Sequence, residues 1–129
     1  MTTANTAYDL MGGEATVHAI VDRFYQLMDS LPETYGIRKM HAADLSGSAD
    51  KLFMFLSGWF GGPQLYVEKF GHPQLRARHL PFPIGGDERD QWMLCMRTAL
   101  TENITDVALR DSLLKAIGDL ADFMRNRPE

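Results

Sequence analysis

The 129-residue chain has few side chains of the kinds that crosslink a fold or gather around a metal: one cysteine, Cys95, and four histidines. A single cysteine excludes an internal disulfide, and it also excludes a zinc site built from several thiolates of one chain. No apolar run reaches the length of a membrane span, and no charged segment followed by an apolar stretch opens the chain. We therefore expect a cytoplasmic protein with no membrane partner.

An excess of positive charge is also absent. The formal net charge is -4, with 13 Lys and Arg against 17 Asp and Glu. Phosphate backbones bind to basic surfaces, so this balance argues against a nucleic-acid partner. The length suits a single domain over residues 1–129, in which residues 1–7 are expected to form a flexible N-terminal tail.

Strand-like alternation is missing too, whereas apolar residues recur at helical spacing through nearly the whole chain. The spacing predicts four substantial amphipathic helices, and it places residues 63–71 in a loop and Tyr35 to Asp44 in a loop with a short helical turn. The first helix follows Gly12-Gly13 and ends near Leu31-Pro32. The second helix is capped by Asp44 or Ser46 and stopped by Gly61-Gly62-Pro63. The third helix begins at Asp87-Glu88, and the fourth runs from about Thr105 to Arg125.

Each predicted helix has one apolar face, and these faces are expected to form the core of an all-α domain. In chain order the predicted core residues are Val17, Ile20, Val21, Phe24, Leu27 and Met28; Leu52, Phe55, Leu56, Trp59 and Phe60; Trp92, Cys95, Met96 and Ala99; and Leu109, Leu113, Ile117, Leu120 and Met124. Ligand sites in such domains form between facing helices.

The segment GHPQLRARHLPFPIG, residues 71–85, carries the most specific pattern in the chain. Pro73 is expected to begin a short helix, because proline suits a first helical position. Pro81 cannot continue that helix, so His79 is expected at its last turn, in a fixed backbone setting.

Two interpretations of His79 follow from its neighbours. A histidine at a helix C-terminus can simply favour the helix dipole, with Arg76 and Arg78 on a solvated face. Alternatively, a neutral imidazole there could ligate a metal while the arginines pair with carboxylates, next to the apolar run Pro81-Phe82-Pro83-Ile84. Haem is an apolar, metal-bearing cofactor with acidic arms and would fit the second interpretation.

Taken together, the motifs of the chain resemble those of the group II truncated haemoglobins, from about Tyr8 to about Met124. The motifs that carry the resemblance are, in this order, Gly12-Gly13, Arg23-Phe24-Tyr25, Phe55-Leu56 with Trp59, Gly61-Gly62-Pro63, Gly71-His72-Pro73, Arg76-Ala77-Arg78-His79, Pro81-Phe82-Pro83-Ile84, Glu88-Arg89-Asp90, Trp92 and Cys95-Met96. The resemblance implies a truncated globin fold, a two-over-two α-helical sandwich, that holds haem b (iron protoporphyrin IX).

On the proximal side of the haem, the resemblance implies that His79 ligates a five-coordinate iron. Arg78 would face a haem propionate, with Lys51 and Tyr66 as further candidates at the haem edge; the alternative for these two is a solvated face. The apolar wall around the haem would comprise Phe55, Leu75, Phe82, Ile84 and Met96, with Leu52 on the opposite face, one turn beyond Ser48. Such residues would be assigned to the core even without a haem, so their role as a wall depends on the resemblance.

On the opposite, distal side, the resemblance points to Tyr25, His41, Ser48 and Trp92 as the residues around the bound ligand. His41 is a departure, because this position is most often phenylalanine or tyrosine in globins. A shift of one residue in the loop would place Met40 there instead. Ser48 is small, which leaves the hydrogen bonds to the ligand to Tyr25, His41 and Trp92.

The expected function is binding of dioxygen, and of other diatomic gases such as NO and CO, at a haem iron. Three hydrogen-bonding residues in a low-dielectric pocket favour slow release of oxygen, which suits chemistry or sensing better than transport. The alternatives are an oxygen sensor, a nitric oxide dioxygenase or peroxidase-like enzyme that uses bound O2 or peroxide, and a haem-free helical interaction domain. An enzyme would need a separate reductase, because the chain has no flavin or nicotinamide domain. The sequence leaves monomer and homodimer equally open.

Overall fold

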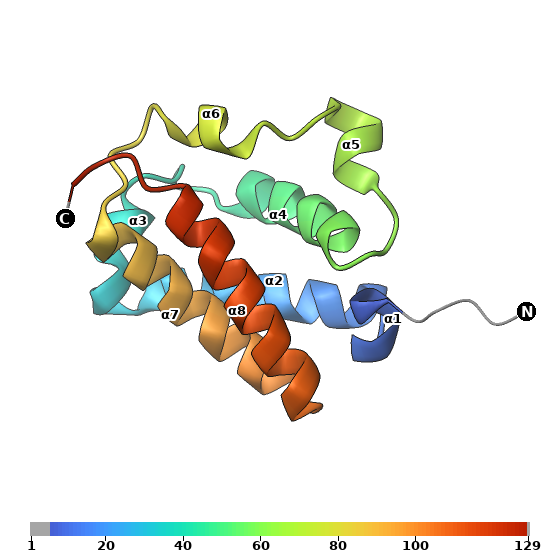
Figure 1. The fold of residues 1–129 in the computed structure, drawn as a ribbon. Coiled ribbons are helices and arrows are strands. Elements are labelled where there is room, and N and C mark those ends of the chain that lie inside the picture. The colour runs from blue at the N-terminus through green and yellow to red at the C-terminus, as the bar shows by residue number, and fades with distance from the viewer. Residues whose placement is uncertain (1–5, 129) are drawn as a thin grey trace, which may run out of the picture.

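The computed structural model describes residues 6–128, and within them it contains helices but no strand (Figure 1). The helices are α1 (Ala7–Met11), α2 (Glu14–Ser30), the 3-10 turn η1 (Pro32–Thr34), α3 (Tyr35–Arg38), α4 (Ser46–Trp59), α5 (Leu65–Phe70), α6 (Leu75–His79), α7 (Gly86–Asn103) and α8 (Val107–Phe123). None of the helices described is long and apolar enough to cross a membrane. The all-α class is confirmed.

Four long helices form the framework. α2 packs against both α4 and α7, and α7 packs against α8. Figure 1 shows α7 and α8 side by side across α2, with α4 beyond α2 and α5 and α6 along the outer edge of the molecule. This is the two-over-two arrangement, in which the pair α2 and α4 faces the pair α7 and α8.

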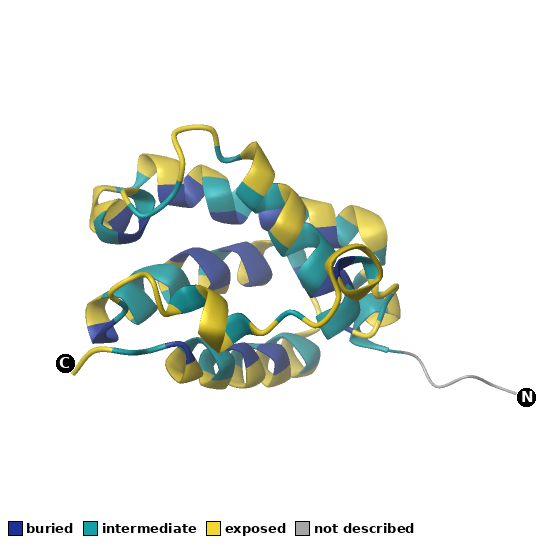
Figure 2. Cartoon of the chain, turned by 90° about the horizontal axis from the view of Figure 1, so that it is seen from above, coloured by how far each residue is buried: buried dark blue, intermediate teal, exposed yellow. Residues whose placement is uncertain are grey.

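The apolar faces predicted from the sequence account for most of the core. All six predicted residues of α2, Val17 through Met28, are buried, and so are Cys95, Met96 and Ala99 of α7. In Figure 2, buried segments of the long helices face the interior and exposed segments face outward. Six of the predicted core residues are only half-buried: Leu52, Phe55 and Trp59 of α4, Trp92 of α7, and Leu109 and Leu120 of α8.

Two local predictions were wrong. Residues 63–71 were expected to be a loop but contain α5, whose buried Tyr66 and packing against α4 stabilise a helix too short to show a period. α6 begins at Leu75 rather than at Pro73, because Gln74 adopts a left-handed conformation, φ 50°, that separates the proline from the helix.

Residues 1–7 were expected to form a flexible N-terminal tail, and residues 1–5 of it lie outside the described residues. Thr6 and Ala7, however, start α1, and the Thr6 side chain accepts a hydrogen bond from the Asp9 N–H at 3.2 Å. The Tyr8 N–H donates to the Phe60 carbonyl at 2.9 Å, so α1 is fixed to the end of α4.

Candidate functional site

His79 is the last residue of α6, as predicted, and its ring orientation is set by the helix itself. Nδ1 of His79 lies 2.6 Å from the backbone carbonyl oxygen of Leu75, one turn earlier. A carbonyl can only accept, so Nδ1 carries the hydrogen and the neutral ring keeps its lone pair on Nε2. A hydrogen bond on the far nitrogen is the usual way in which proteins orient a metal-ligating imidazole.

Four of the exposed large apolar side chains belong to α5 or follow α6. Val67 and Phe70 of α5 are 43% and 40% exposed, and Leu80 and Phe82, which follow His79, are 52% and 40% exposed. Leu80 and Phe82 lie within three residues of His79, so an apolar group bound at this histidine could cover them. A flat apolar group held at His79 would bury side chains of this kind.

The predicted wall and edge residues are distributed around this region. Met96 on α7 is fully buried, whereas Leu52, Phe55, Leu75 and Ile84 are half-buried. The exposed Lys51 places its Nζ 5.8 Å from the centre of the Phe70 ring, and the buried Tyr66 packs against the same ring at 4.9 Å.

Arg78 is exposed on α6, where its Nε donates to the Pro73 carbonyl at 2.7 Å. Its guanidinium therefore closes the turn before α6. No interaction in residues 6–128 joins Arg78 to Lys51 or Tyr66.

The predicted distal residues come from three helices and one loop, and most of them meet. The Tyr25 hydroxyl of α2 donates to the Ser48 carbonyl of α4 at 3.3 Å, and the Tyr25 ring lies 6.0 Å from the His41 ring, edge to face. Phe24 contacts Tyr25 on one side, at 4.9 Å, and Trp92 of α7 on the other, at 5.2 Å. We call Tyr25, His41, Ser48 and Trp92 the distal cluster.

The hydrogen-bonding roles of Tyr25 and His41 in the distal cluster are set by their surroundings. Burial raises the pKa of the Tyr25 hydroxyl well above its ordinary value, so it stays protonated and remains a donor at neutral pH. Nδ1 of His41 is 2.8 Å from the Ile37 carbonyl, which leaves the lone pair of the neutral ring on Nε2. Both side chains of this pair are therefore oriented by partners within the chain.

Two residues that support the site were missed by the sequence analysis. Gln91, next to Trp92 on α7, accepts a hydrogen bond from the Ile37 N–H at 3.0 Å and so holds the turn that carries His41. Asn126, after α8, bonds the chain around His79 and Ile84. Neither belongs to a periodic pattern or a short motif, because each partner is distant in the sequence.

Comparison with known proteins identifies the family of the chain. A family model described as bacterial-like globin matches residues 6–126. The chain belongs to this family. It is 37% identical over 125 residues to the group 2 truncated hemoglobin YjbI of Bacillus subtilis (strain 168), an alignment that covers 97% of this chain and 92% of the relative.

Solved structures show the same relationship. The group II 2-on-2 hemoglobin of Agrobacterium tumefaciens superposes with a TM-score of 0.95 at 48% identity, over 99% of this chain and 98% of the other. The cold-adapted truncated hemoglobin of Pseudoalteromonas haloplanktis TAC125 superposes with a TM-score of 0.93 at 44% identity, over 95% and 99%. The resemblance to group II truncated haemoglobins is therefore confirmed, and with it the two-over-two globin fold. Membership of this family implies a haem cofactor and the binding of diatomic gases.

Proposed function

We propose that the chain holds haem b with the imidazole of His79 as its only protein ligand, and that it binds dioxygen on the side of the distal cluster. The observation that carries this proposal is the 2.6 Å bond from His79 Nδ1 to the Leu75 carbonyl, because it presents Nε2 of a neutral imidazole for coordination. The exposed apolar side chains beside α6 support a large apolar partner at the same place.

When bound, haem supplies an iron whose reactivity the protein controls through the axial ligand, nearby hydrogen bonds and access. The chain's own residues then have separate tasks. Leu52, Phe55, Leu75, Phe82, Ile84 and Met96 would exclude water from the ring. Arg78, Lys51 and Tyr66 would bind the propionates. The Nε of Arg78 already donates to the Pro73 carbonyl, so Arg78 would use its two terminal nitrogens for this task.

The distal cluster would hold the gas by hydrogen bonds. Tyr25 keeps its proton and is half-buried, and its O–H donates to the Ser48 carbonyl at 3.3 Å, a long bond that it would exchange for one to the gas. The Trp92 indole N–H can only donate. The contact between the Tyr25 and His41 rings favours His41 over Met40 as the loop residue of this cluster.

The test of His79 is replacement by Ala, with haem retention measured by the Soret band of the purified protein. We expect haem to be lost and to return when free imidazole is added. The matched control is His72→Ala, since His72 is exposed in the loop before α6 and its Nδ1 accepts only a 3.4 Å bond from the Gln74 N–H. Loss of haem from the His72 variant together with retention in the His79 variant would reverse the assignment.

A second candidate function is redox catalysis, either nitric oxide dioxygenation or a peroxidase-like reaction. The observation that favours it is His41, whose free Nε2 could accept or return a proton beside Tyr25. Turnover of NO or peroxide by the haem-loaded protein, with an added reductase, should fall in His41→Phe if the enzyme reading is right. Unchanged turnover in that variant would remove His41 from the reaction, and turnover no faster than that of free haem would leave gas binding or oxygen sensing as the function.

A further inference from the structure

α6 is attached to the rest of the molecule differently from the other helices. The helix pairs that pack extensively within residues 6–128 are formed by α1 to α5, α7 and α8, together with η1. The main polar attachment of α6 is to residues 124–127, which we call the C-terminal strap. Figure 1 shows this strap running from the end of α8 past α6 and along the chain that joins α6 to α7.

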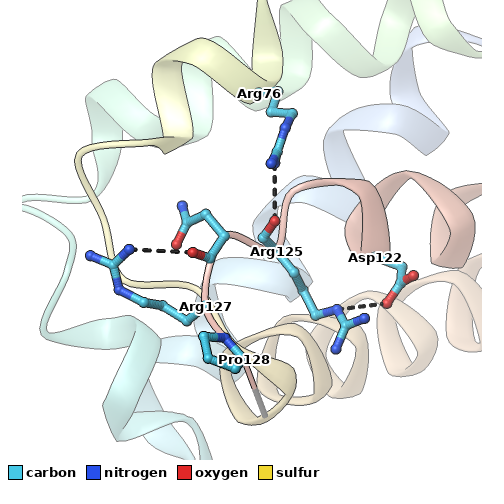
Figure 3. Close-up of a pocket in the computed structure, with 6 residues that line it drawn as sticks. Arg76, Asp122, Arg125, Arg127 and Pro128 are labelled. Atoms are coloured by element: carbon cyan, nitrogen blue, oxygen red, sulfur yellow. Dashed lines mark hydrogen bonds and ion pairs between the residues drawn. The ribbon is translucent and has the colours of Figure 1, made fainter.

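Arg76 makes the first connection between α6 and the strap. Its Nη1 donates to the carbonyl of Phe123 at 3.2 Å and to that of Arg125 at 3.0 Å, and its guanidinium lies 5.6 Å from the centre of the Phe123 ring. Figure 3 shows Arg76 reaching down to the Arg125 carbonyl, at the edge of a pocket of about 660 Å³ beneath α6. The charged donor thus joins the start of α6 to the C-terminal end of α8.

Asn126 makes the second connection, at the histidine itself. Its Nδ2 donates to the carbonyls of His79, at 3.2 Å, and Phe82, at 2.9 Å, while its Oδ1 accepts from the Ile84 N–H at 3.0 Å. An N–H can only donate and a carbonyl can only accept, so these three partners determine the orientation of the amide.

The backbone of the strap adds to this connection. The N–H groups of Asn126 and Arg127 both donate to the Ile84 carbonyl, at 2.8 and 3.1 Å. Met124, at the start of the strap, is buried and anchors it against the core. The strap therefore holds both ends of the turn from His79 to Ile84, a turn that Pro81 and Pro83 keep from forming a helix.

We propose that Asn126 is a positioning residue for His79: by bonding the chain on both sides of the Pro81-Phe82-Pro83 turn, it fixes where α6 ends and in which direction the imidazole is presented. The inference rests on the proposed function of His79. Asn126 touches neither haem nor gas in this role, and it acts only through the backbone of the histidine segment. Replacement of Asn126 should therefore alter the bond that His79 makes, beyond any effect on stability.

The test uses the haem-loaded protein and the variants Asn126→Ala and Asn126→Asp. Aspartate can still accept from the Ile84 N–H, but it cannot donate to the His79 and Phe82 carbonyls, so it should be at least as damaging as alanine. The control is Asn103→Ala, which removes another amide-to-carbonyl bond, from Asn103 Nδ2 to the Ala99 carbonyl at 2.9 Å, far from His79 in the sequence. Arg76→Ala, an exposed position, is a second variant that weakens the strap from its other end and should give a smaller change of the same kind.

Two measurements apply to each variant. Haem transfer to excess apomyoglobin should be roughly tenfold faster in the Asn126 variants, as expected when hydrogen bonds that hold the ligand segment are lost. The iron–imidazole stretch of the ferrous protein, measured by resonance Raman, should shift or broaden in these variants and remain unchanged in Asn103→Ala. A wild-type stretch and a transfer rate within twofold of wild type in Asn126→Ala would overturn the proposal.

A His79→Gly background separates positioning from general loosening. Free imidazole occupies the ligand position there and is not joined to the strap, so Asn126→Ala should no longer change the stretch. A shift of equal size in this background would overturn the proposal, since Asn126 would then act on the pocket rather than through His79. If His79→Gly binds haem normally without imidazole, the proposed function itself fails, an outcome distinct from either result for Asn126.

Discussion

The side-chain oxygen of Gln91 on α7 accepts a hydrogen bond from the backbone N–H of Ile37 on α3, at 3.0 Å. The carbonyl of the same Ile37 bonds Nδ1 of His41 at 2.8 Å. Gly36 makes the approach of Gln91 possible, because a Cβ at this position would lie 2.8 Å from the Gln91 oxygen. The orientation of His41 therefore depends on a residue of α7 that neighbours Trp92, and the two halves of the distal cluster are structurally linked.

Replacing Gln91 with Ala should destabilise the protein by about 1–3 kcal/mol, because it leaves the N–H of the buried Ile37 without its partner. Equilibrium unfolding in urea measures this loss. Gln26→Ala is the control, since Gln26 is exposed and only accepts from Arg23 at 2.7 Å; its effect should stay within about 0.5 kcal/mol. Equal stabilities of the Gln91 and Gln26 variants would contradict the linkage.

Trp92→Phe should release oxygen faster while still binding haem. Loss of a hydrogen bond to a charged partner costs about 1.5–3 kcal/mol, or roughly ten- to a hundredfold in an equilibrium constant. The dissociation rate, measured by stopped-flow mixing, tests this directly. Trp59→Phe is a matched control, because Trp59 packs against Phe60 at the end of α4 and should leave the rate unchanged. An unchanged rate in Trp92→Phe would show that Trp92 packs against Phe24 and does not bond the ligand.

Gas binding should depend on pH through His41. Protonation of Nε2 would convert His41 from an acceptor into a donor towards the ligand. Tyr25, which faces His41 from α2, keeps its proton at neutral pH because burial raises its pKa. The measurement is the pH profile of ligand kinetics in wild type minus that in His41→Phe. A profile that survives intact in the variant would remove His41 from the site and favour Met40.

Asp122 should make the stability sensitive to acid. Its carboxylate accepts from Arg89 Nη1 at 2.6 Å and pairs with Arg125 Nε at 2.9 Å. The hydrogen bond from Arg89, and then the charge of Arg125, hold the pKa of this carboxyl below its ordinary value. A carboxyl whose pKa is lowered by folding stabilises the protein above its unfolded pKa, and this contribution disappears as the pH falls through the folded pKa.

Asp122→Asn should therefore flatten the fall in stability below roughly pH 4, the ordinary range of an aspartate, and lower the stability at neutral pH. Thermal unfolding between about pH 2 and 7 measures both effects. The control is Asp111→Asn, because Asp111 is exposed and its neighbour Arg110 is 3.5 Å away. If both variants follow the same acid curve, the ion pairs of Asp122 contribute nothing measurable.

Much of the framework could be predicted from local patterns. The six buried residues of α2 follow helical spacing, and each projects from a helix long enough for the period to be visible. The placement of His79 at the end of α6 follows from Pro81, which acts on the residues next to it. The start of α6 did not follow, because the left-handed conformation of Gln74 is uncommon for a non-glycine residue and no local pattern marks it.

Amphipathic helices and a proline-bounded histidine were thus determined by the sequence alone, since both arise from interactions between residues a few positions apart. The tertiary structure decided which side chains meet: Gln91 bonds Ile37 across 54 positions, and Asn126 bonds His79 across 47. Such bonds leave no period or motif, because their geometry exists only after α7 and α8 have packed. The same packing turned residues 65–70 into a helix, where burial of Tyr66 against α4 outweighs the weak preference of so short a segment.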